Sequence, residues 1–538
     1  MRLKWKNTAI AGVGAATLVA ISLTPSGANA LAGNLRAHND TYSTQINQAK
    51  TVGAAKGLLA NDNGQPLTVV DHTQPAHGTV TVNADGAFSY TPNFEFKGTD
   101  SFTYTVSNAV QIYSTHLPQL GTFGGVSLTS AAFGSSLAPV PGVPGEFYGL
   151  EDRGPNGTAA NGDIVLPQPD YDPAIAKFKF VNGAADLLTV VPLKAADGTP
   201  YSGRVNSANP TGETAVDLAG NTLAQDPNGY DPEGLVALPD GTFWVSDEYG
   251  PFITHFAANG RAIKRLTPLD GSLPAELVNR VPNKGMEGLT ITPDGTTLVG
   301  AMQSALQQPD LGSTKGTKVA ITRIVTYNLK SHAVHEYLYT LDNPGTTGTA
   351  NSELTALSDT TFLMDERDGN FPPHAYKKLY KINIAGATDV GPSAHVAGAV
   401  YDGTHGGLLI GGKSLEATVG TQDTADATAT LAADGVKVVG KSLYLDLGGL
   451  LDQLNPTGAF FGHDKVEGVA ALNGGKTIVV SNDSDFGLGG VANATPPYTL
   501  TSKILPGTGT QDEGQYLEIN MNRLPAGTST ATVTITVR

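Results

Sequence analysis

The sequence predicts an all-β protein with two units, a small N-terminal β-sandwich followed by a β-propeller of five, six or more blades. Three observations support this prediction. Short apolar or alternating runs recur along the chain and are separated by turn residues. The 538 residues include 65 Gly and 33 Pro, as many short strands joined by tight turns require. A pair of strands with carboxylates at both free ends also recurs along the second unit.

Residues 1–30 have the pattern of an export signal. Arg2, Lys4 and Lys6 form a basic start, an apolar stretch follows, and Ala28-Asn29-Ala30 has the small-x-small form of a cleavage site. The apolar stretch is too short and too rich in small residues for a membrane span. We therefore expect a secreted protein, extracellular or periplasmic, that is cleaved near Ala30 and has no membrane span.

The charge balance of the mature chain is strongly acidic. Removing three basic residues from 33 Lys and Arg leaves 30 against 49 Asp and Glu, which gives a formal charge of −19. This charge disfavours nucleic acid and anionic membranes as partners and suits a protein that binds cations. The chain has 0 Cys, so disulfides and thiolate metal sites are excluded.

The first unit, residues 31–110, carries its own strand pattern. The runs LTVV, GTVTV, AFSYTP and SFTYTV are separated by turns such as Ala84-Asp85-Gly86. GLLANDNGQPLTVV, PAHGTVTVNADGAFSYTPN and FKGTDSFTYTV resemble the cadherin-like, immunoglobulin-like module of bacterial surface proteins. The resemblance implies a spacer or adhesion unit that contacts a cell surface or matrix. Asn61, Asp62 and Asp100 either hold Ca²⁺ at the module end or serve as turn and loop caps.

The second unit, residues 111–538, contains the repeats. In one repeat, PEGLVAL leads through the turn Pro239-Asp240-Gly241 to FWVSDEY. An antiparallel hairpin brings the start of its first strand beside the end of its second, so both acidic ends lie at one edge. Similar repeats begin at MEGLTIT, SELTAL and VEGVAAL, and EFYGLEDRG matches the second half only. Residues 390–460 hold either a degenerate blade or a long insertion, and strands after Gln515 would close the ring near Gly125.

A propeller would place these acidic edges around one axis. The candidate residues at the starts of the inner strands are Glu233, Glu287, Glu353 and Glu467, and the acids at the strand ends are Asp247, Glu248, Asp365, Glu366, Asp368, Asp483 and Asp485. So many carboxylates cannot all stay ionised at close quarters without cations, and an oxygen-rich site without sulfur suits Ca²⁺. The alternative is that each Glu accepts backbone hydrogen bonds at a strand start. Asp240 and Asp294 belong to turns on the opposite edge, where we expect them to be structural.

Basic residues are interleaved with the acids. Arg153 follows Glu151 and Asp152, and Arg367 lies within DERDG. Metal-binding acids beside arginines suit phosphoester hydrolysis, because the metal neutralises phosphate oxygens while the guanidinium binds developing charge. The catalytic candidates are therefore Glu233, Glu287, Glu353, Glu467, Arg153 and Arg367. The alternative is that both arginines form salt bridges only.

The second unit resembles the phytase-like family, whose domain is described as having esterase-like activity. The resemblance rests on DPEGLVALPDGTFWVSDEYGPFI, NKGMEGLTITPDGTTLVGAMQSAL, ELTAL with DERDG, LYKINIAGATDV, and KVEGVAAL with VVSNDSDF. It implies a β-propeller with recurring Glu and Asp at its site and the hydrolysis of phosphoesters. Gln303 stands where other repeats carry an acid, and the first blade has no Glu opening its strand, so we expect an asymmetric site.

Three functions remain open from the sequence. The first is a secreted Ca²⁺-dependent hydrolase that acts on phosphate mono- or diesters of a small molecule. The second is a propeller lactonase or carboxylester hydrolase, which needs an apolar wall beside the metal. The third is a non-catalytic Ca²⁺-binding propeller that binds glycan or matrix. The sequence has no G-x-S-x-G, H-E-x-x-H or P-loop motif, which argues against a serine esterase, a zincin and a P-loop enzyme.

Overall fold

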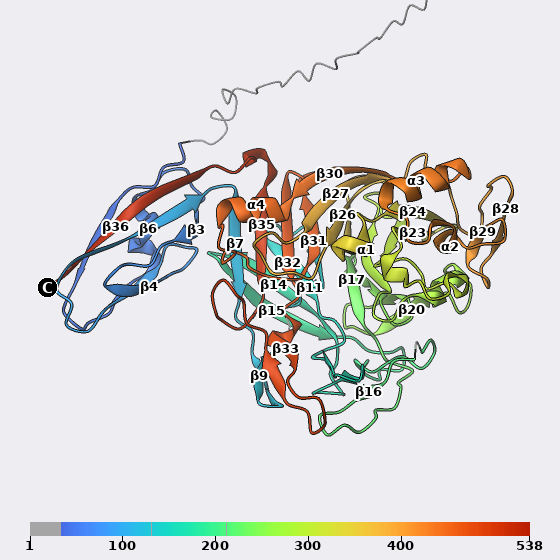
Figure 1. The fold of residues 1–538 in the computed structure, drawn as a ribbon, viewed down its shortest axis with the longest axis horizontal. Helices are drawn as coiled ribbons and strands as arrows, with labels where there is room; N and C mark the ends of the chain where they lie inside the picture. The colour runs from blue at the N-terminus through green and yellow to red at the C-terminus, as the bar shows by residue number, and fades with distance from the viewer. Residues whose placement is uncertain (1–33, 131, 211) are drawn as a thin grey trace, which may run out of the picture.

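A computed structural model describes residues 34–130, 132–210 and 212–538. The export signal and its cleavage site lie outside these residues. Within them, no helix is both long enough and apolar enough to cross a membrane. Figure 1 shows two parts, a small β-sandwich and a larger β-propeller.

The second unit is a propeller of five blades, each with four strands ordered from the axis outward. Blade 1 holds β10 (Ser136–Pro139), β11 (Glu146–Leu150), β14 (Ala174–Val181) and β15 (Ala184–Pro192), and blade 2 holds β17 (Pro232–Ala237), β18 (Phe243–Asp247), β19 (Ile253–Phe256) and β20 (Ala262–Leu266). Blade 3 holds β21 (Met286–Ile291), β22 (Thr297–Met302), β23 (Ile321–Asn328) and β24 (Val334–Thr340). Blade 4 holds β25 (Ala350–Ala356), β26 (Thr361–Arg367), β27 (Lys377–Asn383) and β30 (Gly440–Asp446), and blade 5 holds β31 (Val466–Leu472), β32 (Thr477–Asn482), β35 (Gln515–Asn520) and β7 (Val110–Thr115).

The ring closes between the two ends of the propeller chain. The inner strands pack in the order β10, β17, β21, β25, β31 and back to β10. The outermost strand of blade 5 is β7, which pairs antiparallel with β35 from Gln515 opposite Ser114 to Ile519 opposite Val110. The expected closure by strands after Gln515 is therefore present, but its partner is Val110–Thr115. The chain around Gly125 instead forms the hairpin of β8 (Gln119–Phe123) and β9 (Val126–Thr129).

The long interval before the last repeat is an insertion. It contains the hairpin of β28 (Ala399–Asp402) and β29 (Gly407–Ile410), and the helices α2 (Leu415–Val419) and α3 (Thr424–Ala433). Leu408, Leu415 and Leu431 pack in one apolar cluster with Ile321 and Leu338 of blade 3. The insertion thus covers the outside of blade 3, and α4 (Leu447–Leu454) leads from β30 into blade 5.

The N-terminal module is a sandwich that includes the last strand of the chain. One sheet has the order β1 (Asp40–Thr44), β36 (Thr528–Val537), β6 (Gly98–Ser107) and β3 (Thr68–His72), and the other has the order β2 (Lys50–Val52), β5 (Phe88–Pro92) and β4 (Gly78–Val82). We expected residues 111–538 to form one unit, but β36 pairs with β6 along ten residues and with β1 in parallel. Figure 1 shows β36 lying along β6 and running outward from the junction with blade 5 into the sandwich. Its alternating residues Val533, Ile535 and Val537 are buried in the core of the module, which explains the pairing.

The candidate Ca²⁺ residues of the module serve structural contacts. Asp100 accepts hydrogen bonds from the amides of Ala76 (3.2 Å) and His77 (3.0 Å) and from the Tyr90 hydroxyl (2.9 Å). Asp62 accepts from the His38 amide at 2.7 Å and from the Tyr104 hydroxyl at 3.1 Å. These contacts support the cap interpretation for both aspartates.

Deleting β36 by ending the chain at Ala526 should unfold the sandwich and leave the propeller folded. The deletion removes four buried side chains and the hydrogen bonds between β36 and β6. Limited proteolysis should then cleave within residues 37–108, whereas the blades stay protected. Unchanged protection of residues 37–108 would contradict the pairing. A chain of residues 109–526, which retains β7 and β35, should keep the propeller.

Asp40 makes the stability of the sandwich depend on pH. Burial, with a contribution from the Asp62 carboxylate, raises the pKa of Asp40 to about 6 from 3.8. The folded state therefore holds a proton that the unfolded state has lost between about pH 4 and pH 6, so stability falls as the pH rises through this interval. Asp40→Asn should stabilise the module by about 1–2 kcal/mol at pH 7 and by almost nothing at pH 4. Equal effects of the substitution at the two pH values, in urea unfolding curves, would refute this assignment.

Candidate functional site

Each Glu-Gly pair of the repeats lies in a β-bulge at the start of an inner strand. The pairing register shifts between Pro232 and Leu235 in β17, and the same shift occurs in β21, β25 and β31. A bulge places one extra residue in a strand and changes the direction of a side chain. The glycine is required, because a Cβ on Gly234 would lie 2.6 Å from the Leu289 Cβ on the neighbouring inner strand. The bulge thus turns each Glu toward the mouth of the ring while the glycine allows the strands to pack closely.

Glu353 does not occupy the position of the other three glutamates. Counting from the following Leu or Val, Ser352 aligns with Glu233, and Glu353 aligns with Gly234. Its side chain accepts hydrogen bonds from the amides of Leu289 (3.2 Å) and Leu354 (2.8 Å) and from the Ser136 hydroxyl.

Ser136 of blade 1 occupies the same position in its inner strand as Glu353 does in blade 4. The inner strands of these two blades are not adjacent. Its hydroxyl also accepts from the Leu235 amide at 3.0 Å. Glu353 and Ser136 together link four of the five inner strands across the axis. We therefore describe this pair as the axial clamp.

Successive acids at the end of a second strand point to opposite faces of the blade. Asp247 accepts the amides of Asp231 (2.8 Å) and Gly250 (2.5 Å), and it faces away from the axis. Glu366 is likewise enclosed by Tyr339 and Lys441, each at 2.7 Å. Strand alternation explains this difference, since neighbouring side chains of a strand lie on opposite faces. We call the opening of the ring at this edge the axial mouth. In each blade it is lined by the residue that comes directly after the position of Asp247. These residues are Asp152, Glu248, Gln303, Arg367 and Asp483.

A wall of long connections shelters one side of this mouth. Four connections join strands at the same edge as the acids, and their described residues are 116–130 with 132–135, 151–173, 193–210 with 212–231, and 483–514. They form small sheets of their own, with β9, β33 (Leu488–Val491) and β16 (Ala215–Val216) gathered on one side of the propeller in Figure 1. The connections that form this wall belong to blades 1, 2 and 5. The mouth residues of these blades, Asp152, Glu248 and Asp483, are buried.

The acidic half of the mouth lies between blades 2 and 3. Oxygen atoms of Asp231, Glu233 and Glu248 lie within 4.8 Å of one another, and all three side chains are buried. Glu287 adjoins them and accepts a hydrogen bond from the Gln303 amide group. The repeat pattern in the sequence does not identify Asp231 as a site residue, although it stands two residues before Glu233 in YDPEGL, just before the bulge.

Burial raises the pKa of several of these groups. Burial and the carboxylates of Glu287, Asp231 and Glu248 hold the pKa of Glu233 well above its usual range. Burial, together with the carboxylates of Glu248 and Glu467, also holds the pKa of Glu287 well above its usual range. The pKa of Asp231 rises to about 7 because burial outweighs the stabilising charge of Arg153. Without a cation these carboxyl groups therefore tend to keep their protons, because the surrounding protein supplies too little positive charge to hold all of them ionised.

The basic half lies between blades 4 and 5. Arg367 forms an ion pair with Glu467 and donates from Nε to the Ser352 hydroxyl at 2.9 Å. Lys465 contacts Asp483 at 2.9 Å and Asp485 at 2.5 Å, so Asp485 belongs to this half. Burial opposes the ionisation of Asp485, but Lys465 and Lys503 hold its pKa well below its usual range.

Two further arginines lie behind the acidic half. Arg153 forms an ion pair with Asp231 at 3.2 Å and donates to the Asn156 side chain at 3.2 Å. Arg280, which no sequence motif indicates, donates from Nε to the Glu248 carbonyl. Both Nη atoms of Arg280 are buried without a hydrogen-bond partner among the described residues. Arg280 lies within AELVNRV, which gives no signal of this position beyond a short helical pattern.

Asp365 is buried at the interface of blades 4 and 5, and both its oxygens lack hydrogen-bond partners in the described chain. Burial raises its pKa to about 8, although Arg367 and Lys377 act in the opposite direction. Asp368 instead accepts from Lys377 at 2.9 Å. The turn residues Asp240 and Asp294 lie at the far edge and cap their own turns through Thr242 and Thr296, as expected.

Substitutions of Glu353 test whether the axial clamp stabilises the propeller. Glu353→Ala should destabilise the propeller by about 3 kcal/mol, because it leaves two buried amides without an acceptor and opens a cavity. Glu353→Gln retains an acceptor oxygen and should cost much less. Urea unfolding measures both, and equal stability of Glu353→Ala and the parent would contradict the clamp.

Comparisons with known proteins agree with the geometry of both units. Residues 34–116 match the bacterial Ig domain. An uncharacterized secreted protein of Arthroderma benhamiae is 29% identical over 234 residues, which are 34% of this chain and 45% of that protein, so the match spans less than half of the relative.

Among solved structures, a protein from Lactobacillus plantarum aligns with 77% of this chain and 93% of its own, at 12% identity and a TM-score of 0.28. Virginiamycin B lyase from Staphylococcus aureus aligns with 69% and 99%, at 12% identity and a TM-score of 0.24. At such TM-scores neither structure bears on the fold or the function of this chain. Residues 131–486 match the phytase-like family, described as "esterase-like activity of phytase", and the chain belongs to this family.

Proposed function

We propose that this protein is a secreted hydrolase of phosphate esters that acts at the axial mouth and depends on Ca²⁺. The observation that carries the proposal is the division of the mouth into an acidic half and a basic half. The acidic half, built around Asp231, Glu233, Glu248 and Glu287, suits a cation. The basic half beside it, with Arg367 and Lys465, suits the anionic group of a substrate.

The residues present fit a hard divalent cation. The oxygens Glu248 Oε1, Glu287 Oε2 and Gln303 Oε1 are buried and have no hydrogen-bond partner in the described chain. Buried carboxylates without partners are costly unless a cation joins them. Carboxylate and amide oxygens are the ligands that Ca²⁺ prefers. Asp231, Glu233, Glu248 and Glu287 would hold it, with Gln303 as a neutral ligand, and a bound ion would supply charge neutralisation for phosphate oxygens.

The protein side chains would bind and orient the ester. Arg367 is held in place by Glu467 and Ser352, so its planar group needs little ordering when an anion arrives. Both Nη atoms of Arg280 lack a hydrogen-bond partner within the described part of the chain, which makes this arginine a further candidate for charge stabilisation. The wall beside the mouth would exclude water from one side, which strengthens these electrostatic interactions.

The surroundings of the mouth favour a phosphoester over a lactone. A lactonase needs an apolar wall beside its metal, whereas the neighbours of the acidic half are Arg153, Arg280, Arg367 and Lys465. Family membership supports ester hydrolysis at a coarser level. Export is supported by the signal pattern in residues 1–30 and by the secreted relative from Arthroderma benhamiae.

Glu233→Gln and Glu287→Gln should each weaken Ca²⁺ binding and lower turnover about 100-fold, because they remove charge at the cation but preserve size. Calcium at 100 times its dissociation constant stabilises the parent by about 2.7 kcal/mol, which corresponds to a shift of a few degrees in melting temperature. The measurements are melting curves in EDTA and in Ca²⁺, and hydrolysis of phosphomonoesters, phosphodiesters and lactones.

The matched controls are Asp240→Asn and Asp294→Asn, whose turns lie on the far edge and accept Asn equally well. Both should behave as the parent does. Loss of function in the controls, or full calcium response in the Glu variants, would overturn the metal site. Hydrolysis of lactones alone would replace the phosphoester proposal, and calcium binding without any hydrolysis would favour a binding propeller.

A further inference from the structure

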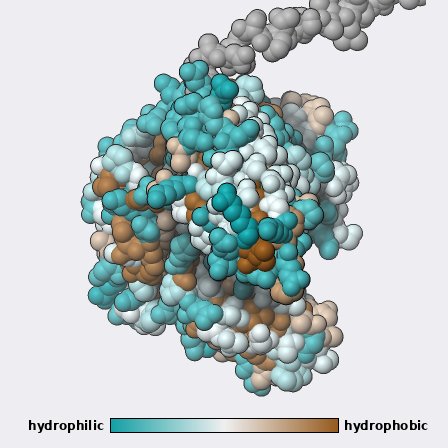
Figure 2. All heavy atoms as spheres, turned by 90° about the vertical axis from the view of Figure 1, so that its left-hand side faces the viewer, coloured by the Kyte–Doolittle hydropathy of each residue, from teal (hydrophilic) through white to brown (hydrophobic). Residues whose placement is uncertain are grey.

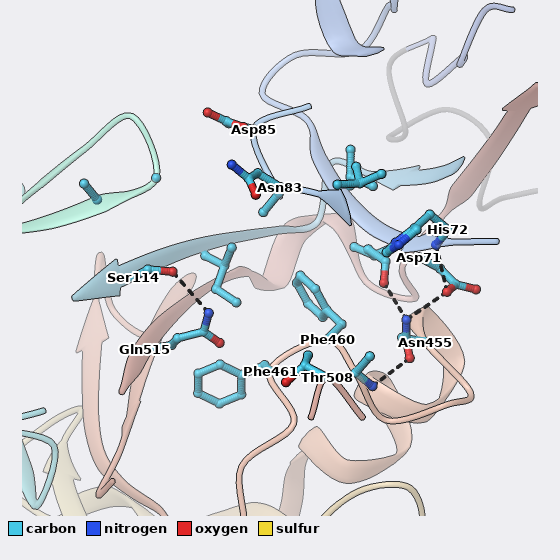
Figure 3. Close-up of a pocket in the computed structure, with 18 of the residues that line it drawn as sticks. Asp71, His72, Asn83, Asp85, Ser114, Asn455, Phe460, Phe461, Thr508 and Gln515 are labelled. Carbon is cyan, nitrogen blue, oxygen red and sulfur yellow. Dashed lines mark hydrogen bonds between the residues drawn. The ribbon is translucent and has the colours of Figure 1, made fainter. Parts of the chain in front are cut away.

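A pocket of about 460 Å³ lies at the junction between the sandwich and blade 5, away from the axial mouth. Figure 3 shows its two sides, with Asp71, His72, Asn83 and Asp85 from the sandwich facing propeller residues such as Gln515. Its volume lies within the range of about 300–1,000 Å³ for small-molecule sites. It is independent of the proposed hydrolytic site.

The pocket has an apolar floor and a polar rim. Phe460 and Phe461, which are 7% and 1% exposed, belong to the floor together with Ile112. The rim is formed by exposed polar residues of both units, among them Asn83 and Asp85. Such a combination of apolar surface with a few polar groups is typical of ligand sites.

The pocket is held in shape by direct contacts between the units. Asn455 donates to the Val70 carbonyl at 2.9 Å and to Asp71 at 3.0 Å, as Figure 3 shows. Within blade 5, Gln515 donates to the Ser114 hydroxyl at 3.1 Å and so fixes the propeller side of the pocket. Val70 itself lies in the same apolar core as Phe460 and Phe461. The two sides are therefore packed together, and a ligand would not have to pay for bringing them into place.

The lining residues indicate the chemistry of the ligand. Asp71 and Asp85 are present, and no Lys or Arg occurs among the described residues of the pocket, so an anionic ligand is disfavoured. The Asn83 amide side chain offers both donors and an acceptor, and the Thr508 hydroxyl offers one donor and an acceptor. A ligand with many neutral hydroxyl groups and apolar C–H faces matches both the rim and the floor.

We propose that this junction pocket binds a neutral saccharide. Figure 2, which views the molecule from the side of the sandwich, shows a mainly hydrophilic surface with separate apolar areas. Saccharide binding at the junction would hold the propeller near a polysaccharide and so raise the local concentration of esters attached to it.

The test uses the full chain and calorimetric titration with neutral cello-, malto-, manno- and xylo-oligosaccharides. At least one class should bind, and the double variant Asn83→Ala/Asp85→Ala should weaken that binding about tenfold. Thr508→Ala, on the propeller side, should weaken it as well. Turnover of soluble phosphoesters should stay at the parental level, so this test is separate from that of the axial mouth.

Asp240→Ala is the matched control. Asp85 and Asp240 are both exposed turn residues that accept the amide two residues later, at 2.9 Å and 3.0 Å. The control should bind saccharide as the parent does, and melting curves establish that each variant is folded. The proposal is overturned if no neutral oligosaccharide binds, or if the pocket variants bind as the parent does. Preference for acidic polysaccharide or for polylysine would also overturn it.

Discussion

The close approach of five inner strands around one axis is the constraint on which this structure depends. Gly234, Gly288 and Gly468 allow three strands to pack against their neighbours where a Cβ would collide. At the two remaining positions Ser136 and Glu353 fill the centre and satisfy the amides of adjacent strands. Hydrogen bonds that span the ring thus join the inner strands of blades 1 to 4 and fix these blades relative to one another at the axis.

The same constraint determines where charge gathers. The bulge that places a glycine at the axis also turns the preceding residue toward the mouth, where Glu233, Glu287 and Glu467 lie. Blades 1 and 4 carry serine at that position, so the mouth is asymmetric. Strong charge of one sign is therefore concentrated at blades 2 and 3, while Arg367 and Lys465 balance the acids at blades 4 and 5.

The sequence predicts much of this arrangement because hairpins and Glu-Gly pairs are local signals. It predicts the blades, the acidic edge and the structural role of Asp240. It does not separate Glu353 from the other glutamates, because a shift of one residue inside a bulge depends on pairing with another strand. Nor does it distinguish Asp247 from Glu248, which differ only in the face of the blade they occupy. Asp231 and Arg280 acquire their positions through contacts distant in sequence, and β36 pairs with a module at the other end of the chain.

The pairing of β36 has a consequence for how the protein is made. Asn39 accepts a hydrogen bond from the Thr532 amide, 493 residues away in the sequence. Because the chain is synthesised from its N-terminus, blade 5 cannot be completed before β35 has been made. The sandwich likewise cannot be completed before β36 has been made. Until then β6 and β7 expose unpaired strand edges, which are prone to aggregation. Closing such long loops is slow, so we expect the pairing of β35 and β36 to set the rate of folding, and a chain that lacks both strands to leave both units open.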